Sequence, residues 1–251
     1  MSTFKIVGRK PVKEALEHNM PLKMIYLAPT ATGKIIDNIK KDANKQGIST
    51  KTIDKNNLQK LADNENHQGI VALMESLPTL DLDGFLEDLI GTPNPLLAIL
   101  DGIEDPRNLG AILRVADAAG VSGVIIPSRR SASLSPGAIK SSAGAAFFAK
   151  VIEVPNLARA IDTLKKQNFW IAGTAMEDSK PAWEQRLDMP LAIVLGSESK
   201  GMHRLIRDKC DFYINLPMVG RVESLNVATA ASAFFYEVMR QKAVASSKAS
   251  K

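Results

Sequence analysis

The sequence predicts an α/β protein of two domains, a small one followed by a larger one built on a parallel sheet. Its 251 residues are long enough for two modest domains. The second part repeats a short apolar run followed by an amphipathic helix, which is typical of a parallel sheet covered by helices. Residues 79–94 carry four acids and no base, and prolines flank them. This composition predicts a domain boundary there.

The first domain is expected to cover residues 1–78, with helices and strands in alternation. The expected helices are residues 11–18, 34–46 and 57–62, and Gly47 ends the second of them. The expected strands are residues 23–27, 48–53 and 69–74. Residues 79–94 are then expected to form an acidic linker with at most one short helix.

The second domain is expected to cover residues 95–243. Its apolar runs are short and almost uninterrupted, as expected of strands buried on both faces. The runs are residues 96–100, 121–126, 151–154, 170–175, 191–195 and 212–216. A helix is expected over residues 157–166, and a long one from Ser224 to about Lys242 closes the domain. Residues 244–251 are expected to be a disordered tail.

The composition excludes several classes of protein. The chain is 24% charged and 45% hydrophobic, which is ordinary for a folded domain. No apolar run reaches the roughly 18 residues of a membrane helix, and no secretory signal is expected behind residues 1–10. Cys210 is the only cysteine, so internal disulfides and cysteine-cluster metal sites are excluded, and a cytoplasmic location is favoured. The three histidines show no zinc spacing.

The net charge of +5 is distributed unevenly. Residues 1–78 carry +4, residues 79–94 carry −4, residues 95–243 carry +3 and the tail carries +2. Two basic domains therefore flank an acidic segment. This permits a nucleic-acid partner without establishing one.

Polar segments follow three of the predicted strands, at the sheet edge where open α/β sheets bind ligands. In the first segment, Asp105 and Pro106 are a favourable helix start, and Asn108 and Arg114 lie on that helix. Asn108 can also be an ordinary first-turn cap residue, and Arg114 an ordinary solvated charge. Gly110 inside the helix costs about 1 kcal/mol, which suggests that another group approaches it closely.

The other two segments follow later strands of the same sheet. In the second segment, Glu198 lies between Gly196 and Gly201, which allow a sharp turn or a close approach to a ligand. Neither a Walker nor a Rossmann spacing is present. In the third, Ser224 and Asn226 start the final helix, where free backbone N–H groups are available to a ligand. Serine and asparagine are also common helix caps, so a purely structural role stays open.

Together the three segments resemble the three motifs of the SpoU/TrmH family of RNA ribose 2′-O-methyltransferases, in the SPOUT superfamily. Residues 108–110 with Arg114 resemble motif one, residues 196–198 with Gly201 motif two, and residues 216–218 with 224–226 motif three. Residues 4–78 resemble the family's small substrate-binding domain, which is similar to ribosomal protein L30e and ends in a His-Gln-Gly signature, here residues 67–69. The layout is most similar to members that methylate a guanosine of 23S rRNA.

This resemblance implies an α/β trefoil-knot fold for the second domain, with S-adenosylmethionine bound in the knot. It also implies a homodimer in which each active site is completed near the partner subunit. Backbone atoms of three residues would hold the cofactor, namely Gly196, Leu216 and Leu225. Further lining residues would be Thr174, Leu195, Gly201 and Met218.

The family assigns the 2′-OH proton to the arginine of motif one, here Arg114. Arginine stays protonated in proteins, so the alternative is that Arg114 remains cationic and stabilises the developing alkoxide. Asn108 and Asn226 would orient the arginine and the ribose, Glu198 would hold the site together, and Ser224 would hydrogen-bond nearby. The sulfonium donor is already activated, so no metal is expected.

Basic residues in both domains are candidate phosphate contacts. They are Lys5, Arg9, Lys10 and Lys13 in the small domain and Arg129, Arg130 and Lys140 in the large one. His203 is expected to be a surface helix residue, and Arg221 and Glu223 add charge that the family pattern lacks. The alternatives are a methyltransferase for tRNA or for an antibiotic-resistance site in rRNA, and a non-catalytic RNA-binding assembly factor.

Overall fold

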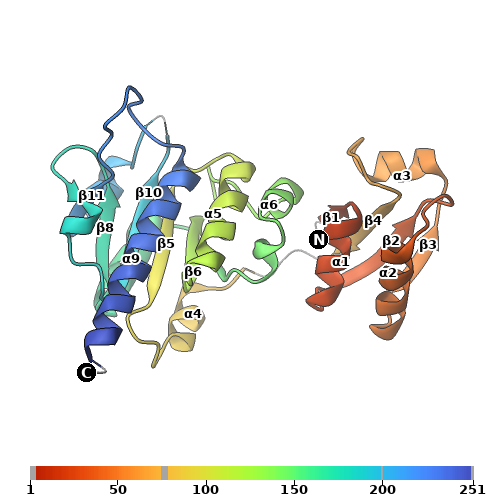
Figure 1. Cartoon of the computed structure of the whole chain (residues 1–251), viewed down its shortest axis with the longest axis horizontal. Coiled ribbons are helices and arrows are strands. Elements are labelled where there is room, and N and C mark those ends of the chain that lie inside the picture. The colour runs from red at the N-terminus through yellow and green to blue at the C-terminus, as the bar shows by residue number, and fades with distance from the viewer. Residues whose placement is uncertain (1–3, 75–78, 199, 250–251) are drawn as a thin grey trace.

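The computed structural model describes residues 4–74, 79–198 and 200–249, which form two α/β domains, each with its own sheet (Figure 1). No helix in these ranges is long and apolar enough to cross a membrane. The expected division into a small domain followed by a larger one is thus visible in the sheets themselves.

The small domain has a four-stranded sheet in the order β1-β4-β2-β3. The strands are β1 (Phe4–Val7), β2 (Leu22–Leu27), β3 (Ser49–Thr52) and β4 (Ile70–Met74). The helices are α1 (Arg9–Glu17), α2 (Lys34–Lys45) and α3 (Lys55–Leu61). Every expected element is confirmed to within about two residues at each end, and β1 is an additional strand that pairs antiparallel with β4.

The large domain has a seven-stranded sheet in the order β7-β6-β5-β10-β8-β11-β9, and all its strand pairs are parallel. The strands are β5 (Leu96–Asp101), β6 (Gly123–Pro127), β7 (Val151–Val154), β8 (Trp170–Thr174), β9 (Lys180–Pro181), β10 (Leu191–Gly196) and β11 (Phe212–Asn215). The six expected strands are confirmed. The two-residue β9 is too short to leave a pattern in the sequence.

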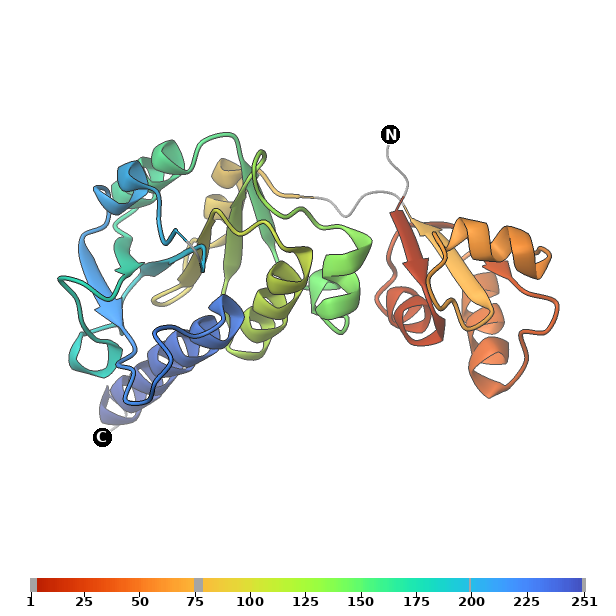
Figure 2. The same ribbon diagram turned by 90° about the horizontal axis from the view of Figure 1, so that it is seen from above.

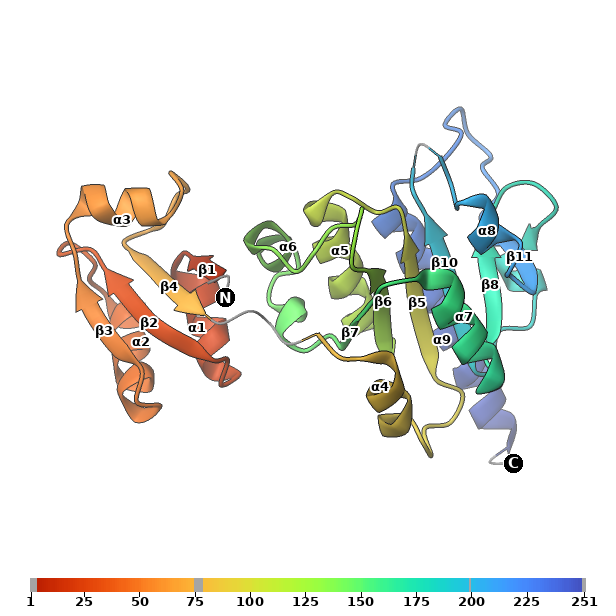
Figure 3. The same ribbon diagram turned by 180° about the vertical axis from the view of Figure 1, so that it is seen from behind.

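Helices cover both faces of this sheet. Helices α5 (Pro106–Ala118) and α9 (Val227–Ala249) cover one face (Figure 1). Helices α4 (Leu82–Asp88), α7 (Leu157–Lys166) and α8 (Arg204–Arg207) lie on the other (Figure 3). Successive side chains of β5 point to opposite faces of the sheet and enter different hydrophobic clusters. Leu96, Ala98 and Leu100 belong to one cluster, and Leu97 and Ile99 belong to the other. This explains why its apolar run is uninterrupted.

The acidic segment is not a free linker, contrary to the sequence prediction. Leu80 pairs with Ile152 beside β7, and Asp81 caps α4 by accepting a hydrogen bond from the backbone N–H of Gly84 at 2.9 Å. Phe85 is 1% exposed and fills the space beside Gly123, where a Cβ would overlap its ring. The acidic side chains lie on the outer face of a helix whose apolar face is buried, so this segment belongs to the large domain.

The C-terminal segment also differs from the prediction. Residues 244–249 continue α9 instead of forming a disordered tail, and residues 250–251 lie outside the described ranges. The helix also begins at Val227, three residues later than expected, because Asn226 serves as its cap. Alanine-rich sequence continues past residue 242, and alanine has the highest helix propensity.

Helix α6 (Pro136–Ser141) and the short 3₁₀ helix η1 (Ala145–Phe147) lie between α5 and the small domain (Figure 2). Lys140 Nζ forms an ion pair with Glu65 of the small domain at 2.8 Å. The rings of His18 and Phe148 meet edge to face with centroids 4.0 Å apart. The small domain therefore contacts the large one through α6 and the turn that follows it.

Gly110 is the point at which α5 meets α6. A Cβ at this position would overlap the Ser141 hydroxyl and the Ala138 carbonyl oxygen, and would lie 2.9 Å from the backbone nitrogen of Ser142. The close approach that the sequence suggested thus comes from the neighbouring helix α6.

We expect Gly110→Ala to lower the free energy of unfolding by about 1–3 kcal/mol, because α6 must move away from the added methyl group. The matched control is Gly137→Ala in α6, where the nearest atom would be 3.6 Å from the new Cβ. The control should change stability by less than about 1 kcal/mol. Urea unfolding of both variants measures the difference, and equal stabilities would contradict this account of Gly110.

Candidate active site

The first two polar segments meet because β5 and β10 are neighbours in the sheet. Gly196 pairs with Asp101, so both strands end at the same level of one edge. After β5, Asp105 caps α5 by accepting a hydrogen bond from the backbone N–H of Arg107 at 2.8 Å. The Arg107 side chain also hydrogen-bonds to this carboxylate and holds the pKa of Asp105 below its usual value. The cap fixes the first turn of α5, which carries Asn108.

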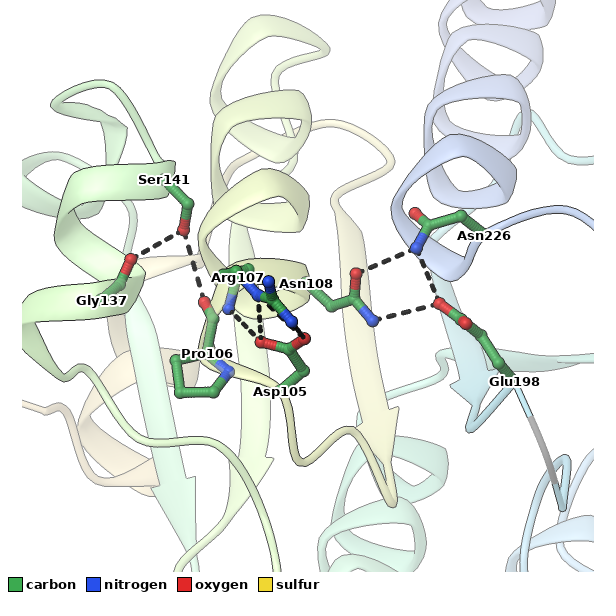
Figure 4. Close-up of polar contacts among 8 residues, drawn as sticks. All are labelled: Asp105, Pro106, Arg107, Asn108, Gly137, Ser141, Glu198 and Asn226. Atoms are coloured by element: carbon green, nitrogen blue, oxygen red, sulfur yellow. Dashed lines mark hydrogen bonds and ion pairs between the residues drawn. The ribbon is translucent and has the colours of Figure 1, made fainter.

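Three motif side chains form one hydrogen-bonded cluster (Figure 4). Glu198 Oε1 accepts hydrogen bonds from Asn108 Nδ2 at 3.1 Å, from Asn226 Nδ2 at 2.7 Å and from the backbone N–H of Val227 at 3.2 Å. Asn226 Nδ2 also donates to Asn108 Oδ1 at 3.0 Å. One carboxylate oxygen thus joins α5, the turn after β10 and the start of α9. We call this the Glu198 cluster.

Asn226 is both a cap and a member of this cluster. Its Oδ1 accepts a hydrogen bond from the backbone N–H of Ala228 at 3.0 Å, which caps α9. Because the oxygen is used for the cap, the NH₂ group is turned toward Glu198. Asn226 therefore does cap a helix, as the sequence left open, and this cap also orients its amide to donate a hydrogen bond to Glu198.

The turn between Gly196 and Gly201 is tight. Ser197 and Gly201 pair through two backbone hydrogen bonds of 3.0 and 2.9 Å, and Gly201 has a φ of +65°. A Cβ on Gly196 would overlap the backbone of Gly201. Glycine is required at Gly196 for space and favoured at Gly201 by the backbone angle.

A cavity of about 240 Å³ lies beneath this turn, between the ends of β8, β10 and β11 and the start of α9. Its lining includes all seven residues expected to bind the cofactor, namely Thr174, Leu195, Gly196, Gly201, Leu216, Met218 and Leu225. Ser224 lines the same cavity and is exposed; it precedes α9 and is not its cap. We call this space the inner cavity.

A second cavity of about 480 Å³ adjoins the inner one, and the two share Ser197, Glu198, Gly201 and Val227. Asn108 and His203 are among the other lining residues. We call this space the outer cavity. Since Glu198 borders both cavities, the Glu198 cluster stands where their contents would meet.

His203, which lines the outer cavity, makes a contact with Asp101 that the sequence did not reveal. Asp101, 4% exposed, accepts hydrogen bonds from the backbone nitrogen of His203 at 2.6 Å and lies 2.8 Å from its Nδ1. His203 lies on the surface as expected, with its side chain 71% exposed, but it occupies the position before α8 and is not within the helix. Asp101 ends an apolar strand, which is the one signal that could have singled it out.

Arg114 is not part of the Glu198 cluster. It lies exposed on α5, six residues after Asn108. Within the described ranges no hydrogen bond or ion pair holds its side chain, so one chain alone does not place Arg114 in either cavity.

Several of the predicted phosphate contacts have partners within the protein. The Arg9 guanidinium donates to the carbonyl oxygens of Gln68 and Thr32 at 2.9 and 3.2 Å, and so ties together two loops of the small domain. Three lysines pair with acids: Lys5 with Asp63, Lys13 with Glu17 and Lys140 with Glu65.

The remaining basic candidates are more accessible. Lys10 is 80% exposed and lies 3.8 Å from Glu14. Arg129 and Arg130 are exposed in the loop after β6, and no ion pair with another described residue holds either of them. The backbone of Ala132, in the same loop, hydrogen-bonds to the carbonyl oxygen of Ile103, which lines the outer cavity. These two arginines therefore lie on a loop next to the candidate site.

Two family models match the chain. Residues 95–236 match the SpoU rRNA Methylase family, and residues 5–80 match the RNA 2′-O ribose methyltransferase substrate-binding domain. The chain belongs to the SpoU/TrmH family of RNA methyltransferases. It is 47% identical over 243 residues to a TrmH family tRNA/rRNA methyltransferase of Staphylococcus aureus, which covers 96% of this chain and 98% of that protein.

Solved structures agree with this assignment. The SpoU methyltransferase AviRb from Streptomyces viridochromogenes, in complex with AdoMet, matches with a TM-score of 0.81 and 24% identity over 96% of this chain and 91% of its own. The A. aeolicus TrmH/SpoU tRNA modifying enzyme matches with a TM-score of 0.55 and 26% identity over 66% of this chain and 84% of its own. The expected fold class, a SPOUT α/β domain behind a small α/β domain, is confirmed.

The protein is thus an S-adenosylmethionine-dependent RNA ribose 2′-O-methyltransferase. The inner cavity suits such a cofactor, because Leu195, Leu216 and Leu225 offer apolar walls and the tight turn at Gly196 brings backbone close to the space. Across the described residues, no group of three or more His, Cys, Asp or Glu side chains is placed to hold a metal ion.

The Glu198 cluster leads to a prediction about two substitutions. We expect Glu198→Ala to lower the free energy of unfolding by about 0.5–1.5 kcal/mol, because three donors lose their acceptor but the two exposed amides can bond to water instead. The methyl-transfer rate should fall by about 100-fold as Asn108 and Asn226 lose their positions. Glu198→Gln keeps an oxygen acceptor and should lose less of both. Urea unfolding and single-turnover transfer measure the two effects, and a Gln variant as damaged as the Ala variant would show that charge, not the acceptor, matters.

Proposed function

We propose that this protein methylates the ribose 2′-OH of a guanosine in 23S rRNA, as RlmB does, and that it acts as a homodimer. The observation that carries the choice of rRNA is the docked small domain, whose Glu65 and His18 contact α6 and the turn behind it. The tRNA modifying enzyme of A. aeolicus matches only 66% of this chain, a share about as long as the large domain. A large folded RNA gives the added domain a second place to bind.

We propose that the two cavities hold the two reactants. S-adenosylmethionine in the inner cavity supplies a methyl group that its sulfonium has already activated. The acceptor nucleotide enters the outer cavity, where Asn108 and Glu198 border the inner one. The Glu198 cluster then holds the 2′-oxygen in line with the methyl group. Fixing two reactants in this way removes much of the entropic barrier of the transfer.

Arg114 is assigned a role in the assembled dimer. Its side chain is exposed on α5, and α5 packs beside α9, whose outer face carries the exposed apolar side chains Tyr236 and Met239. Val219, in the loop before α9, is 99% exposed. A second copy of the chain would cover this apolar surface. We propose that Arg114 acts at the resulting junction, as a cation that stabilises the developing alkoxide while the proton of the 2′-OH passes to solvent water.

Two alternative functions predict different results in a methyl-transfer assay. A tRNA methyltransferase, which the "tRNA/rRNA" name of the Staphylococcus aureus relative allows, would transfer methyl to tRNA in preference to 23S rRNA. A non-catalytic assembly factor would bind RNA without transferring methyl. The intact Glu198 cluster supports a catalytic role over that of an assembly factor.

The decisive assay uses labelled S-adenosylmethionine with 23S rRNA, with tRNA, and with 23S rRNA whose candidate guanosines carry a 2′-deoxy sugar. We expect label on 23S rRNA alone, at a single guanosine ribose. Arg114→Ala should abolish transfer, by about 100-fold or more, and leave donor binding nearly unchanged. Arg159→Ala on the opposite face of the sheet is the matched control and should keep full activity. Transfer of label to tRNA would show that tRNA, and not 23S rRNA, is the substrate. Full activity of Arg114→Ala would show that Arg114 has no part in the mechanism.

The loop after β6 gives a separate prediction. Replacing Arg129 and Arg130 with alanine should weaken the binding of an rRNA fragment. A plot of the logarithm of the binding constant against the logarithm of the salt concentration should also become less steep, by the amount expected for the loss of about one to two phosphate contacts. Lys165→Ala removes a lysine paired with Asp211 on another face and should change neither quantity. Filter binding over a range of salt concentrations measures both slopes. An unchanged slope in the double variant would show that this loop does not contact phosphate.

A further inference from the structure

Asn215, the last residue of β11, has a buried oxygen without a partner. Its Oδ1 is shielded from solvent and makes no hydrogen bond with the described residues, and no other side-chain atom among them is buried and unpaired in this way. Asn215 lines the inner cavity. Buried polar atoms in folded proteins almost always have a partner, so an unpaired acceptor beside a cavity points to a donor on the ligand.

The neighbouring residues fix which end of the Asn215 amide faces Ser179. Ser179 Oγ donates its only hydrogen to the carbonyl oxygen of Met176 at 3.0 Å. It must therefore accept the bond from Asn215, whose Nδ2 lies 2.7 Å away. The opposite orientation of the amide would place two acceptors together. The Asn215 oxygen is thus held away from Ser179, ready to accept a hydrogen bond.

The position of Asn215 indicates which part of the cofactor it meets. The methyl group must lie near Glu198, where the two cavities adjoin. Glu198 follows β10 and Asn215 ends β11, with β8 between the two strands, so these ends are about 10 Å apart. The cavity near Asn215 has apolar walls from Ile214, Leu216 and Phe234. A flat neutral base suits such walls, whereas the charged amino-acid end of the cofactor would be costly to bury there.

We propose that Asn215 Oδ1 accepts a hydrogen bond from the exocyclic amine of the cofactor's adenine, and so selects adenine over other bases. This inference rests on the proposed placement of S-adenosylmethionine in the inner cavity. It assigns a side chain that none of the three motifs contains, and Ser179 becomes the residue that orients it.

The test compares binding of two ligands by calorimetry. One is S-adenosylhomocysteine, and the other is its analogue in which unsubstituted purine replaces adenine, so that only the amine is missing. The wild-type protein should prefer the adenine ligand by about fivefold to tenfold, the usual worth of one hydrogen bond. Asn215→Leu should bind both equally, and Asn215→Asp, which keeps an oxygen acceptor, should retain a preference.

Two controls separate this role from a structural one. Asn44→Leu makes the same substitution at an exposed asparagine of α2, in the small domain, and it should leave the preference unchanged. Ser179→Ala frees the amide to rotate and should reduce the preference. If Asn215→Leu keeps the wild-type preference, or if the wild-type protein binds both ligands equally well, the adenine contact is wrong. If the wild-type protein binds neither ligand, the cofactor site itself is wrong.

Discussion

The active-site architecture depends on one carboxylate oxygen that accepts three hydrogen bonds. Glu198 Oε1 receives the Asn108 amide from α5, the Asn226 amide from the loop before α9, and the first backbone N–H of α9. Without this acceptor, the start of α9 and the first turn of α5 would keep their direct Asn226–Asn108 hydrogen bond but lose their shared partner in the turn after β10. Removing this acceptor also leaves the partly buried backbone N–H of Val227 without its partner, which adds to the cost of losing the bonds themselves. The cluster therefore couples local stability to the position of the reacting groups.

Strand order makes this convergence possible. Because β5 and β10 are adjacent and parallel, Asp101 and Gly196 end at the same level, and the segments that follow them must turn over the same edge. Strand β11 lies one strand further, beyond β8, and the long segment after it returns over that edge to reach α9. The gap left between these ends is the inner cavity. Polar residues far apart in sequence meet because the strands before them are parallel neighbours.

Much of this arrangement was predictable, and the exceptions have physical causes. Buried parallel strands leave apolar runs, and helix starts leave Asp-Pro or Asn signals, so the strands and the polar segments that follow them could be predicted from the pattern of the sequence. Site roles for Asn108, Glu198 and Asn226 followed only from the resemblance to the family's motifs. The packing of Phe85 against Gly123 could not be predicted, because the acidic residues around it dominate the composition of that segment. The position of Arg114 outside the Glu198 cluster could not be predicted either, because it depends on which elements of the fold pack over the surface of α5. Asp101 and Asn215 were missed because each looks like the ordinary polar end of a strand.

The pairing of basic residues narrows the RNA-binding surface that net charge suggested. Lys5, Lys13 and Lys140 pair with nearby acids, and Arg9 joins two loops, so these four side chains have partners within the protein. Such exposed pairs add little stability, but they reduce the charge available to phosphate. The unpaired arginines of the loop after β6 lie next to the outer cavity, while the small domain is fixed to the large one through α6. RNA recognition is therefore expected to begin beside the catalytic edge, and the small domain extends that contact to a second part of the RNA.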